Sequence, residues 1–379
     1  MKEYLLTAGP TPVPERVLLA MARPVYYHRS PVFTECLREV QDSLRWLFQT
    51  KQLPLVLTGS GTVGMEAAVA NFLRAGDKAL VIRGGKFGER WGRICQAFGV
   101  ECVFIDVEWG KGVDPKLVAE ALEKTPDVRA VYATACETST ATSHDVKEIA
   151  KIVKAKPDTI MCVDAITAIG VTDVPVDEWG FDVTVCGSQK ALMLPPGLAM
   201  VAVSDKGWKA NERANLPRFY ADLGRERKSQ DKGETAFTPA ISLVMGLRES
   251  LRMMKEETLE GVWNRHERLA KATRAAAGGL GLDLLSSSPA NAVTGFRMPA
   301  GIDGAAVIKQ MRKYGITIAG GQDHLKGKIV RIAHIGYVSE FDIITAISGL
   351  EMTLSDLGFG VRPGAGVASA QATFAGTRA

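Results

Sequence analysis

The sequence has few of the residues that build disulfide frameworks or metal centres. Its six cysteines and five histidines are spread over 379 residues, without the close spacing that redox motifs and zinc sites need. The cysteines are Cys36, Cys95, Cys102, Cys136, Cys162 and Cys186, and the histidines are His28, His144, His266, His324 and His334. We therefore expect reduced, mostly buried cysteines and no structural metal.

Long apolar runs and an excess of one charge are also missing. No stretch reaches about 18 uninterrupted apolar residues, and the first ten residues contain no long apolar core. The 46 basic and 42 acidic residues are interspersed, without the basic stripe that binding to a phosphate backbone requires. These absences predict a cytoplasmic protein that binds neither membranes nor nucleic acid.

Length and pattern predict a two-domain α/β protein. A chain of 379 residues, 46% of them apolar, is longer than a single compact core usually needs. Short apolar runs alternate with helical patterns, such as Gly64–Leu73 and Lys116–Leu122. This alternation favours a mostly parallel, seven-stranded sheet covered by helices on both faces. The predicted strands are Leu53–Leu57, Lys78–Ile82, Glu101–Val107, Val128–Ala133, Thr159–Val163, Val183–Cys186 and Gly197–Val203.

The pattern changes after Ile241, where a long amphipathic stretch begins. A second helix is predicted over Trp263–Ala277, ended by the glycines at 278 and 279. A smaller α/β unit follows, with predicted strands at 292–298 and 328–333 and predicted helices at 305–314 and 340–357. We expect an N-terminal arm (1–13), a large domain (14–257), a small C-terminal domain (258–357) and a mobile tail without periodicity (358–379).

An acid and an amine follow two neighbouring predicted strands. Asp164 ends the run that starts at Thr159, and Lys190 follows the next strand after small polar residues. In a parallel sheet both lie at the carboxyl edge, where such folds bind ligands. Taken singly, an Asp there is usually a cap or turn former, and an isolated Lys is usually solvated. Together they suit pyridoxal 5′-phosphate (PLP), which takes a lysine at its aldehyde and a carboxylate at its pyridine nitrogen.

The glycine-rich loop Thr58–Thr62 offers a cradle for the phosphate of that cofactor. Its glycines, its hydroxyls and the helix N-terminus that follows attract a dianion. The segment Gly59–Gly64 also fits the dinucleotide fingerprint GxGxxG. An NADP-dependent oxidoreductase, with Arg83 as the NADP selector, is therefore an alternative of a different class, and a turn without a ligand is another. Neither alternative explains Asp164 and Lys190.

Several segments in matching order carry a family resemblance. The most specific is Gly187–Gly197, around Lys190. The supporting segments are Ala8–Pro12, His28–Ser30, the Ser-Gly-Thr loop at Ser60, Glu137–Thr140, Val163–Ala165 and Val330–Ile332. In these segments the chain resembles the class V, fold-type I PLP-dependent aminotransferases of the alanine:glyoxylate and serine:pyruvate group, from Leu6 to about Leu357.

The resemblance implies a role for each matching residue. Lys190 would be the catalytic residue and hold PLP as an internal aldimine, and Asp164 would pair with the ring nitrogen. The other cofactor-binding residues that it implies are Ser60, Gly61, Thr62, Phe87, Thr138, Gln189 and, from the second subunit, Thr238. Phe87 stands where the family commonly has Trp, and Thr138 stands where Ser is more frequent. Thr235 stands where the family can have a Tyr that contacts the phosphate, so a phosphate contact from Thr235 is an open question.

The resemblance also implies the substrate contacts and the assembly. Arg331 would bind the α-carboxylate with two parallel hydrogen bonds, which suits its planar guanidinium. Without the resemblance, Arg331 is more simply interpreted as a solvated charge at a strand end. Gly9 would belong to an arm that closes over the active site. The family forms homodimers with active sites at the subunit interface.

The expected activity is ping-pong transamination between a small L-amino acid, alanine or serine, and a 2-oxo acid, glyoxylate or pyruvate. No second arginine for a distal carboxylate stands in the matched segments, which favours small substrates. An aspartate or phosphoserine aminotransferase of the same class is the alternative. A desulfurase is disfavoured, because none of the six cysteines lies in a segment that resembles the mobile catalytic loop of that class.

Overall fold

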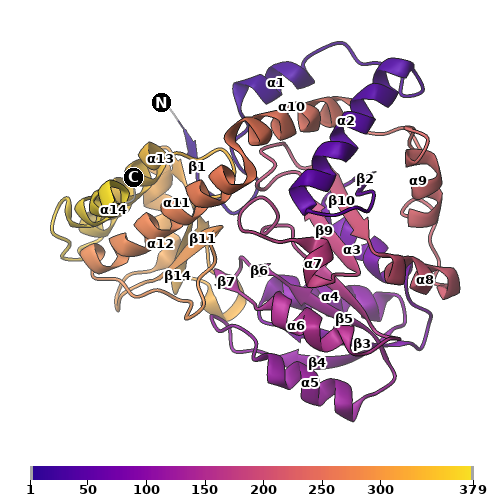
Figure 1. Cartoon of the computed structure of the whole chain (residues 1–379). Helices are drawn as coiled ribbons and strands as arrows, with labels where there is room; N and C mark the ends of the chain where they lie inside the picture. Colours follow the sequence, from indigo (N-terminus) through magenta and orange to yellow (C-terminus); the bar gives the residue numbers. More distant parts are fainter. Residues whose placement is uncertain (1–2, 377–379) are drawn as a thin grey trace.

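The computed structural model describes residues 3–376, which form a large and a small lobe (Figure 1). The large lobe contains a seven-stranded sheet with the order β2-β10-β9-β8-β5-β3-β4. Its strands are β2 (Leu55–Thr58), β3 (Lys78–Arg83), β4 (Glu101–Asp106), β5 (Val128–Thr134), β8 (Ile160–Asp164), β9 (Val183–Gly187) and β10 (Leu198–Val203). Strand β10 is antiparallel to both neighbours, and the other pairs are parallel. The predicted fold class is confirmed.

Alternate residues of these strands enter two separate hydrophobic cores, one on each face of the sheet. On β5, Val131 belongs to one core, whereas Ala130 and Tyr132 belong to the other. Strands β8 and β9 are buried along their whole length, because helices cover both faces. The helices of this lobe are α1 (Glu15–Met21), α2 (Pro31–Phe48), α3 (Gly61–Ala70), α4 (Lys86–Ala97), α5 (Pro115–Lys124), α6 (Val146–Lys154), α7 (Val176–Trp179), α8 (Asp205–Arg213), α9 (Leu223–Gln230) and α10 (Ile241–Glu257).

The small lobe packs helices against a three-stranded antiparallel sheet of order β11-β14-β13, around a third hydrophobic core. Its elements are α11 (Leu259–Leu280), β11 (Val293–Arg297), α12 (Gly304–Lys313), β12 (Ile316–Thr317), β13 (Ala319–Gly320), η1 (Asp323–Leu325), β14 (Ile329–Ala333), α13 (Glu340–Asp356) and α14 (Ala365–Gly376). The N-terminal strand β1 (Tyr4–Leu5) pairs with β12. The following residues therefore run from the small lobe to the large one. Two short strands, β6 (Cys136–Glu137) and β7 (Thr142–Ser143), pair with each other.

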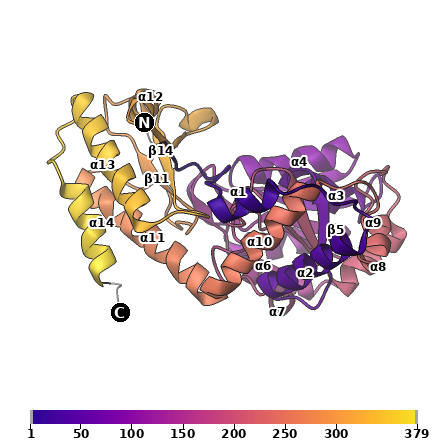
Figure 2. The same ribbon diagram turned by 90° about the horizontal axis from the view of Figure 1, so that it is seen from above.

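The two lobes are joined by a bend between α10 and α11 (Figure 2). Thr258 has a φ of 71°, outside the helical region, and its hydroxyl accepts a hydrogen bond from Gly261 N at 3.1 Å. This bond caps the start of α11. Helix α10 packs against α1 and α2, whereas α11 packs against α13 and α14. In the described part of the chain, no helix has both the length and the apolar character that crossing a membrane requires.

The prediction of a mobile tail after residue 357 is wrong for its described part, because α14 is a helix packed on α11. Residues 377–379 of the predicted tail lie outside the described residues. Its buried residues Gly366, Ala370 and Phe374 recur every four positions. The carboxylate of Glu351 accepts a hydrogen bond from Gly366 N at 2.6 Å at the helix start, where the helix dipole favours a negative charge. Glycine and alanine contribute little to a hydrophobic pattern, so no periodic signal marks this helix in the sequence.

The predicted helix end at the glycines 278 and 279 is also wrong. Helix α11 continues to Leu280 and is capped by Gly281, which has a left-handed φ of 66°. A Cβ atom at Gly279 would lie 2.4 Å from the carbonyl oxygen of Ala365. Gly279 therefore allows the close approach of α14 instead of ending its own helix.

Candidate active site

Lys190 and Asp164 both lie at the carboxyl edge of the sheet, as predicted. Asp164 is the last residue of β8, and Lys190 follows the end of the neighbouring strand β9. Both line one cavity, together with six of the other residues predicted to bind a cofactor. These six are Ser60, Gly61, Thr62, Phe87, Thr138 and Gln189. The structure thus brings together eight predicted residues that are up to 130 positions apart in the sequence, from Ser60 to Lys190.

Burial changes the acidity of both central groups. Asp164 is 4% exposed and accepts a hydrogen bond from Ile166 N at 3.0 Å. Loss of water around its carboxylate raises the pKa of Asp164 to about 6. Burial lowers the pKa of Lys190 to about 8, although the nearby Asp164 acts in the opposite direction. A larger share of the Lys190 amine is therefore uncharged at neutral pH than in a free lysine, which suits attack on a carbonyl carbon.

The N-terminal arm covers Lys190. The Lys190 Nζ donates a hydrogen bond to the carbonyl oxygen of Ala8, and the Thr11 hydroxyl donates to the Lys190 carbonyl oxygen at 3.0 Å. A Cβ atom at Gly9 would lie 2.2 Å from Lys190 Nζ. Gly9 also has a φ of 132°, which favours glycine, so a side chain here would strain the backbone and displace the end of Lys190. The role of Gly9 in substrate binding stays a prediction.

Arg331 lies on β14 of the small lobe and is not among the residues that line the cavity of Lys190, although it contacts one of them. It is 7% exposed, and its Nε donates to the Gly320 carbonyl oxygen at 2.9 Å. One terminal nitrogen donates to the carbonyl oxygen of Thr138, which lines the cavity. Burial lowers the pKa of Arg331 to about 10, so the guanidinium stays charged at neutral pH. Its interpretation as a solvated strand-end charge is wrong.

The glycine-rich loop forms the N-terminal end of α3 at the cavity. Ser60 is the N-cap residue, but its side chain makes no capping hydrogen bond, so the first amides of α3 have no partner from that hydroxyl. A Cβ atom at Gly61 would lie 2.4 Å from the Ile166 side chain. The buried Oε1 of Gln189 has no hydrogen-bond partner among the described residues. The amides at the start of α3 can donate to a phosphate group, whereas the unpaired Oε1 of Gln189 can only accept a hydrogen bond from a bound molecule.

The fold does not support the dinucleotide interpretation of the GxGxxG segment. That fingerprint belongs to a parallel βαβ unit. Here β2 lies at the edge of the sheet and pairs with the antiparallel β10. The strand that follows α3 is β3, which lies near the opposite edge of the sheet.

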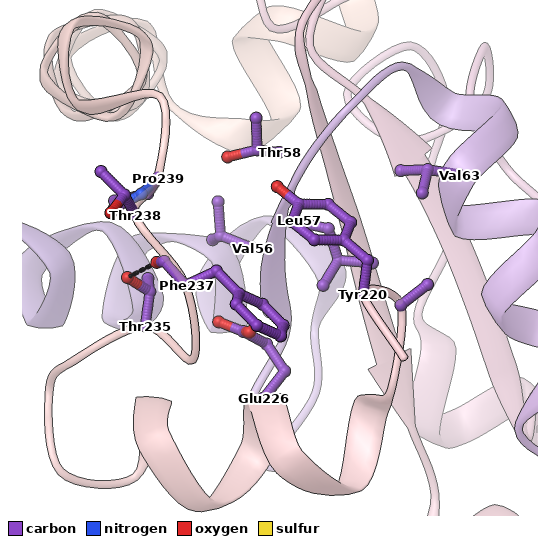
Figure 3. Close-up of a pocket in the computed structure, with 11 residues that line it drawn as sticks. Val56, Leu57, Thr58, Val63, Tyr220, Glu226, Thr235, Phe237, Thr238 and Pro239 are labelled. Atoms are coloured by element: carbon purple, nitrogen blue, oxygen red, sulfur yellow. Dashed lines mark hydrogen bonds between the residues drawn. The ribbon is translucent and has the colours of Figure 1, made fainter. Parts of the chain in front are cut away.

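Thr238 does not line the cavity of Lys190 in the same chain. It lines a second cavity with Thr58, Tyr220 and Thr235 (Figure 3). The Thr235 hydroxyl donates to the Phe237 carbonyl oxygen at 2.7 Å, so its own proton is engaged within the loop. A role for Thr238 in the cavity of a second subunit stays a prediction.

Two residues that the sequence analysis did not select also shape the site. The buried carboxylate of Glu137 accepts hydrogen bonds from Phe87 N at 2.9 Å and Gly88 N at 3.0 Å, at the start of α4. These bonds fix the backbone of Phe87. The Arg90 guanidinium lines the cavity and lies 4.8 Å from the centre of the Phe87 ring. Glu137 belongs to one of the segments that carry the family resemblance, but its hydrogen-bond partners lie about 50 residues away in the sequence. Arg90 belongs to none of these segments, so no sequence signal indicated its place in the cavity.

Potential metal ligands do not cluster in the described part of the chain. No group of three or more His, Cys, Asp or Glu side chains in residues 3–376 is arranged to hold a metal ion. All six cysteines are free, and five of them are buried. The polar and reactive groups that line the cavity are the amine of Lys190, the carboxylate of Asp164, several hydroxyls, an amide, a guanidinium and the thiol of Cys136. Burial raises the pKa of the Cys136 thiol to about 12, so this thiol stays protonated at neutral pH.

The fold is the one found in aminotransferases of known structure. The family model of the class V aminotransferases matches residues 3–338, and the chain belongs to this family, which confirms the resemblance and the enzyme class. Class V aminotransferases are PLP-dependent enzymes that act on amino acids and keto acids.

Individual relatives carry different names. The chain is 44% identical to a protein of Synechococcus sp. (strain PCC 6716) called "Soluble hydrogenase, small subunit", with 97% of each chain covered. It is 36% identical to the L-aspartate–glyoxylate aminotransferase of Paracoccus denitrificans, covering 98% of this chain and 96% of the other. It is 35% identical to the serine–glyoxylate aminotransferase of Methylorubrum extorquens, and the match covers 97% of this chain and 95% of the other.

Among solved structures, the fold is similar to that of ureidoglycine–glyoxylate aminotransferase from Bacillus subtilis. The TM-score is 0.94 at 30% identity, and 99% of this chain and 98% of the other are covered. The hydrogenase name describes the cyanobacterial relative.

Proposed function

We propose that this protein transfers the amino group of a small L-amino acid, alanine or serine, to glyoxylate or pyruvate, using PLP bound at Lys190. The observation that carries the proposal is the buried pair of Lys190 and Asp164 in one cavity, with the amine pKa lowered to about 8. Because Arg331 reaches Thr138 on the wall of that cavity, an α-carboxylate bound there would lie near the amine.

The residues of the cavity fit PLP at each of its parts. Lys190 would hold the aldehyde carbon, and Asp164 would keep the pyridine nitrogen protonated. The Phe87 ring would stack on the pyridine ring, with Thr138 beside it. The phosphate would be held by Ser60, Gly61, Thr62 and Gln189, three of which stand at the start of α3.

The chain's own groups then perform the binding and proton transfers. Bound PLP supplies a ring that withdraws electrons from the substrate α-carbon. As a free amine, Lys190 Nζ would move the proton from the substrate α-carbon to the C4′ carbon of the cofactor, and in the opposite direction when the 2-oxo acid is converted to an amino acid. Arg331 orients the α-carboxylate, and the arm at Gly9 closes the cavity to water. Two such half-reactions in sequence give ping-pong kinetics.

The choice of amino donor has a second candidate. Aspartate is supported by the relative named L-aspartate–glyoxylate aminotransferase. An acidic donor, aspartate or phosphoserine, is also supported by Arg90, which lines the cavity without an ion pair among residues 3–376. We favour alanine and serine, because Arg90 contacts Thr62 at the predicted phosphate end of the cavity. A distal carboxylate would then be buried without a dedicated partner.

A panel of donors and acceptors tests this proposal. With glyoxylate or pyruvate as acceptor, alanine and serine are expected to give kcat/KM values at least about tenfold above those of aspartate and phosphoserine. Omission of the acceptor should limit the reaction to one turnover per active site. A higher rate with aspartate or phosphoserine would replace the first choice of donor with the second, and no turnover with any donor would reject the proposal.

We further propose a cytoplasmic homodimer in which Thr238 of each subunit contacts the phosphate in the other. The support is the second cavity at Thr238, which is flanked by the exposed aromatic residues Phe219 (66%) and Tyr220 (48%). The free state of all six cysteines is typical of a reducing compartment.

The expected result in analytical ultracentrifugation is a species of twice the chain mass of 40.8 kDa. Thr238→Ala should sediment in the same way but bind PLP more weakly, by about 1 kcal/mol for one lost hydrogen bond. Thr345→Ala, on an exposed turn of α13, is the control and should change neither property. A fully active monomer at assay concentration would contradict the dimer proposal.

A further inference from the structure

The predicted phosphate cradle contains no formal positive charge. Ser60, Gly61 and Thr62 offer hydroxyls and backbone amides, and Gln189 offers an amide group. A phosphate monoester carries about 1.5 to 2 negative charges at neutral pH, whereas a helix N-terminus contributes only about half a positive charge. The groups assigned so far therefore leave a dianion incompletely neutralised.

Arg90 is a cation beside this cradle. Its Nη1 donates a hydrogen bond to the Thr62 hydroxyl at 3.2 Å, and its guanidinium lies 4.8 Å from the centre of the Phe87 ring. Among the described residues that line the cavity, Arg90 and Lys190 are the only ones with a basic side chain. Lys190 is directed toward the carbonyl oxygen of Ala8, which leaves Arg90 as the cation next to the start of α3.

The charges on α4 show that Arg90 differs from its neighbours. Lys86 and Arg93 both form ion pairs with Glu89, at 2.7 Å and 3.4 Å. No Asp or Glu within residues 3–376 forms an ion pair with Arg90, whose side chain is half-buried in the cavity wall. The hydrogen bond that Arg90 donates is to a neutral hydroxyl, so the guanidinium keeps donors that can bind an anion in the cavity.

We propose that Arg90 binds the phosphate group of PLP and supplies the charge that the neutral cradle lacks. This inference rests on the proposed function, because it assumes that PLP binds in the cavity. The contact with Thr62 favours the phosphate over a distal carboxylate of the substrate, since Thr62 lies in the first turn of α3. Arg90 donates charge-assisted hydrogen bonds there, which are stronger than those of neutral donors.

The test compares two ligands that differ only in the phosphate group. Cofactor-free wild type, Arg90→Met, Arg90→Lys and Arg93→Met are titrated with PLP and with pyridoxal, and the Kd is measured by absorption and tryptophan fluorescence. Arg90→Met is expected to weaken PLP binding about 10- to 100-fold, the range for hydrogen bonds to a charged group. It should change pyridoxal binding less than about threefold, and Arg90→Lys should recover part of the loss.

The controls separate the possible roles of Arg90. Arg93→Met removes an exposed cation from the same helix and should leave both Kd values unchanged. An equal loss of affinity for PLP and pyridoxal in Arg90→Met would show a structural role and overturn the inference. Unchanged PLP binding with a raised KM for aspartate would assign Arg90 to a substrate carboxylate and also overturn it. Failure of the wild type to bind PLP would instead reject the proposed function itself.

Discussion

Replacing Lys190 with alanine is expected to abolish transamination and the yellow colour of the protein together. The wild type should absorb at about 400–430 nm with PLP bound through a lysine, and Lys190→Ala should lose this band. Because the same amine also moves the substrate proton, kcat/KM should fall by about 10⁴-fold, near the upper end for loss of an acid–base group. Absorption spectra and steady-state rates measure the two effects on the same preparations.

Lys190→Arg is the matched control for charge and size. It keeps a cation that can donate to the carbonyl oxygen of Ala8, but a guanidinium does not lose its proton at accessible pH. Both variants should therefore fold and both should be inactive. Borohydride reduction of the wild type followed by peptide mass spectrometry should find a pyridoxyl group on Lys190. Its absence there, or full activity of either variant, would contradict the assignment.

The strands of the large lobe were predictable because each is a short apolar run with glycine or polar residues at its ends. Observed strands such as β3 and β9 end within one residue of the predicted ranges. The errors at Gly279 and α14 have one physical cause. Two helices pack there through glycine and alanine, and close packing of small residues leaves no hydrophobic period in a sequence.

The site was predictable where chemistry follows from a position on the sheet. Asp164 and Lys190 follow adjacent parallel strands, so their meeting needed only the fold class. Glu137 and Arg90 depend instead on how α4 packs beside the segment at 137–139 and the start of α3. The sequence does not show such contacts, because it records neither the register of a helix nor the pairing of distant segments.

Arg331→Ala is expected to lower kcat/KM for every amino acid and 2-oxo acid substrate. The loss of transition-state stabilisation should be about 2 to 5 kcal/mol, as for a buried charge pair that loses one partner. The reason is that an α-carboxylate bound near Thr138 would lose its planar, two-bond partner. Arg331→Lys should recover only part of the loss, because an ammonium group cannot form two parallel bonds. Rates measured across alanine, serine and glyoxylate give the size of the effect.

The loss in Arg331→Ala must be separated from damage to the fold, because the variant also removes the bonds to Gly320 and Thr138. Arg297→Ala, at an exposed position on the neighbouring strand β11, controls for loss of a surface cation and should leave kcat/KM unchanged. Ethylamine, which resembles alanine without its carboxylate, provides the sharper comparison. In the wild type, kcat/KM for alanine should be much higher than kcat/KM for ethylamine. In Arg331→Ala this ratio should fall toward one, while the absorption of bound PLP stays the same. If the variant lost activity toward both amines equally, Arg331 would support the fold of the cavity and would not bind the α-carboxylate.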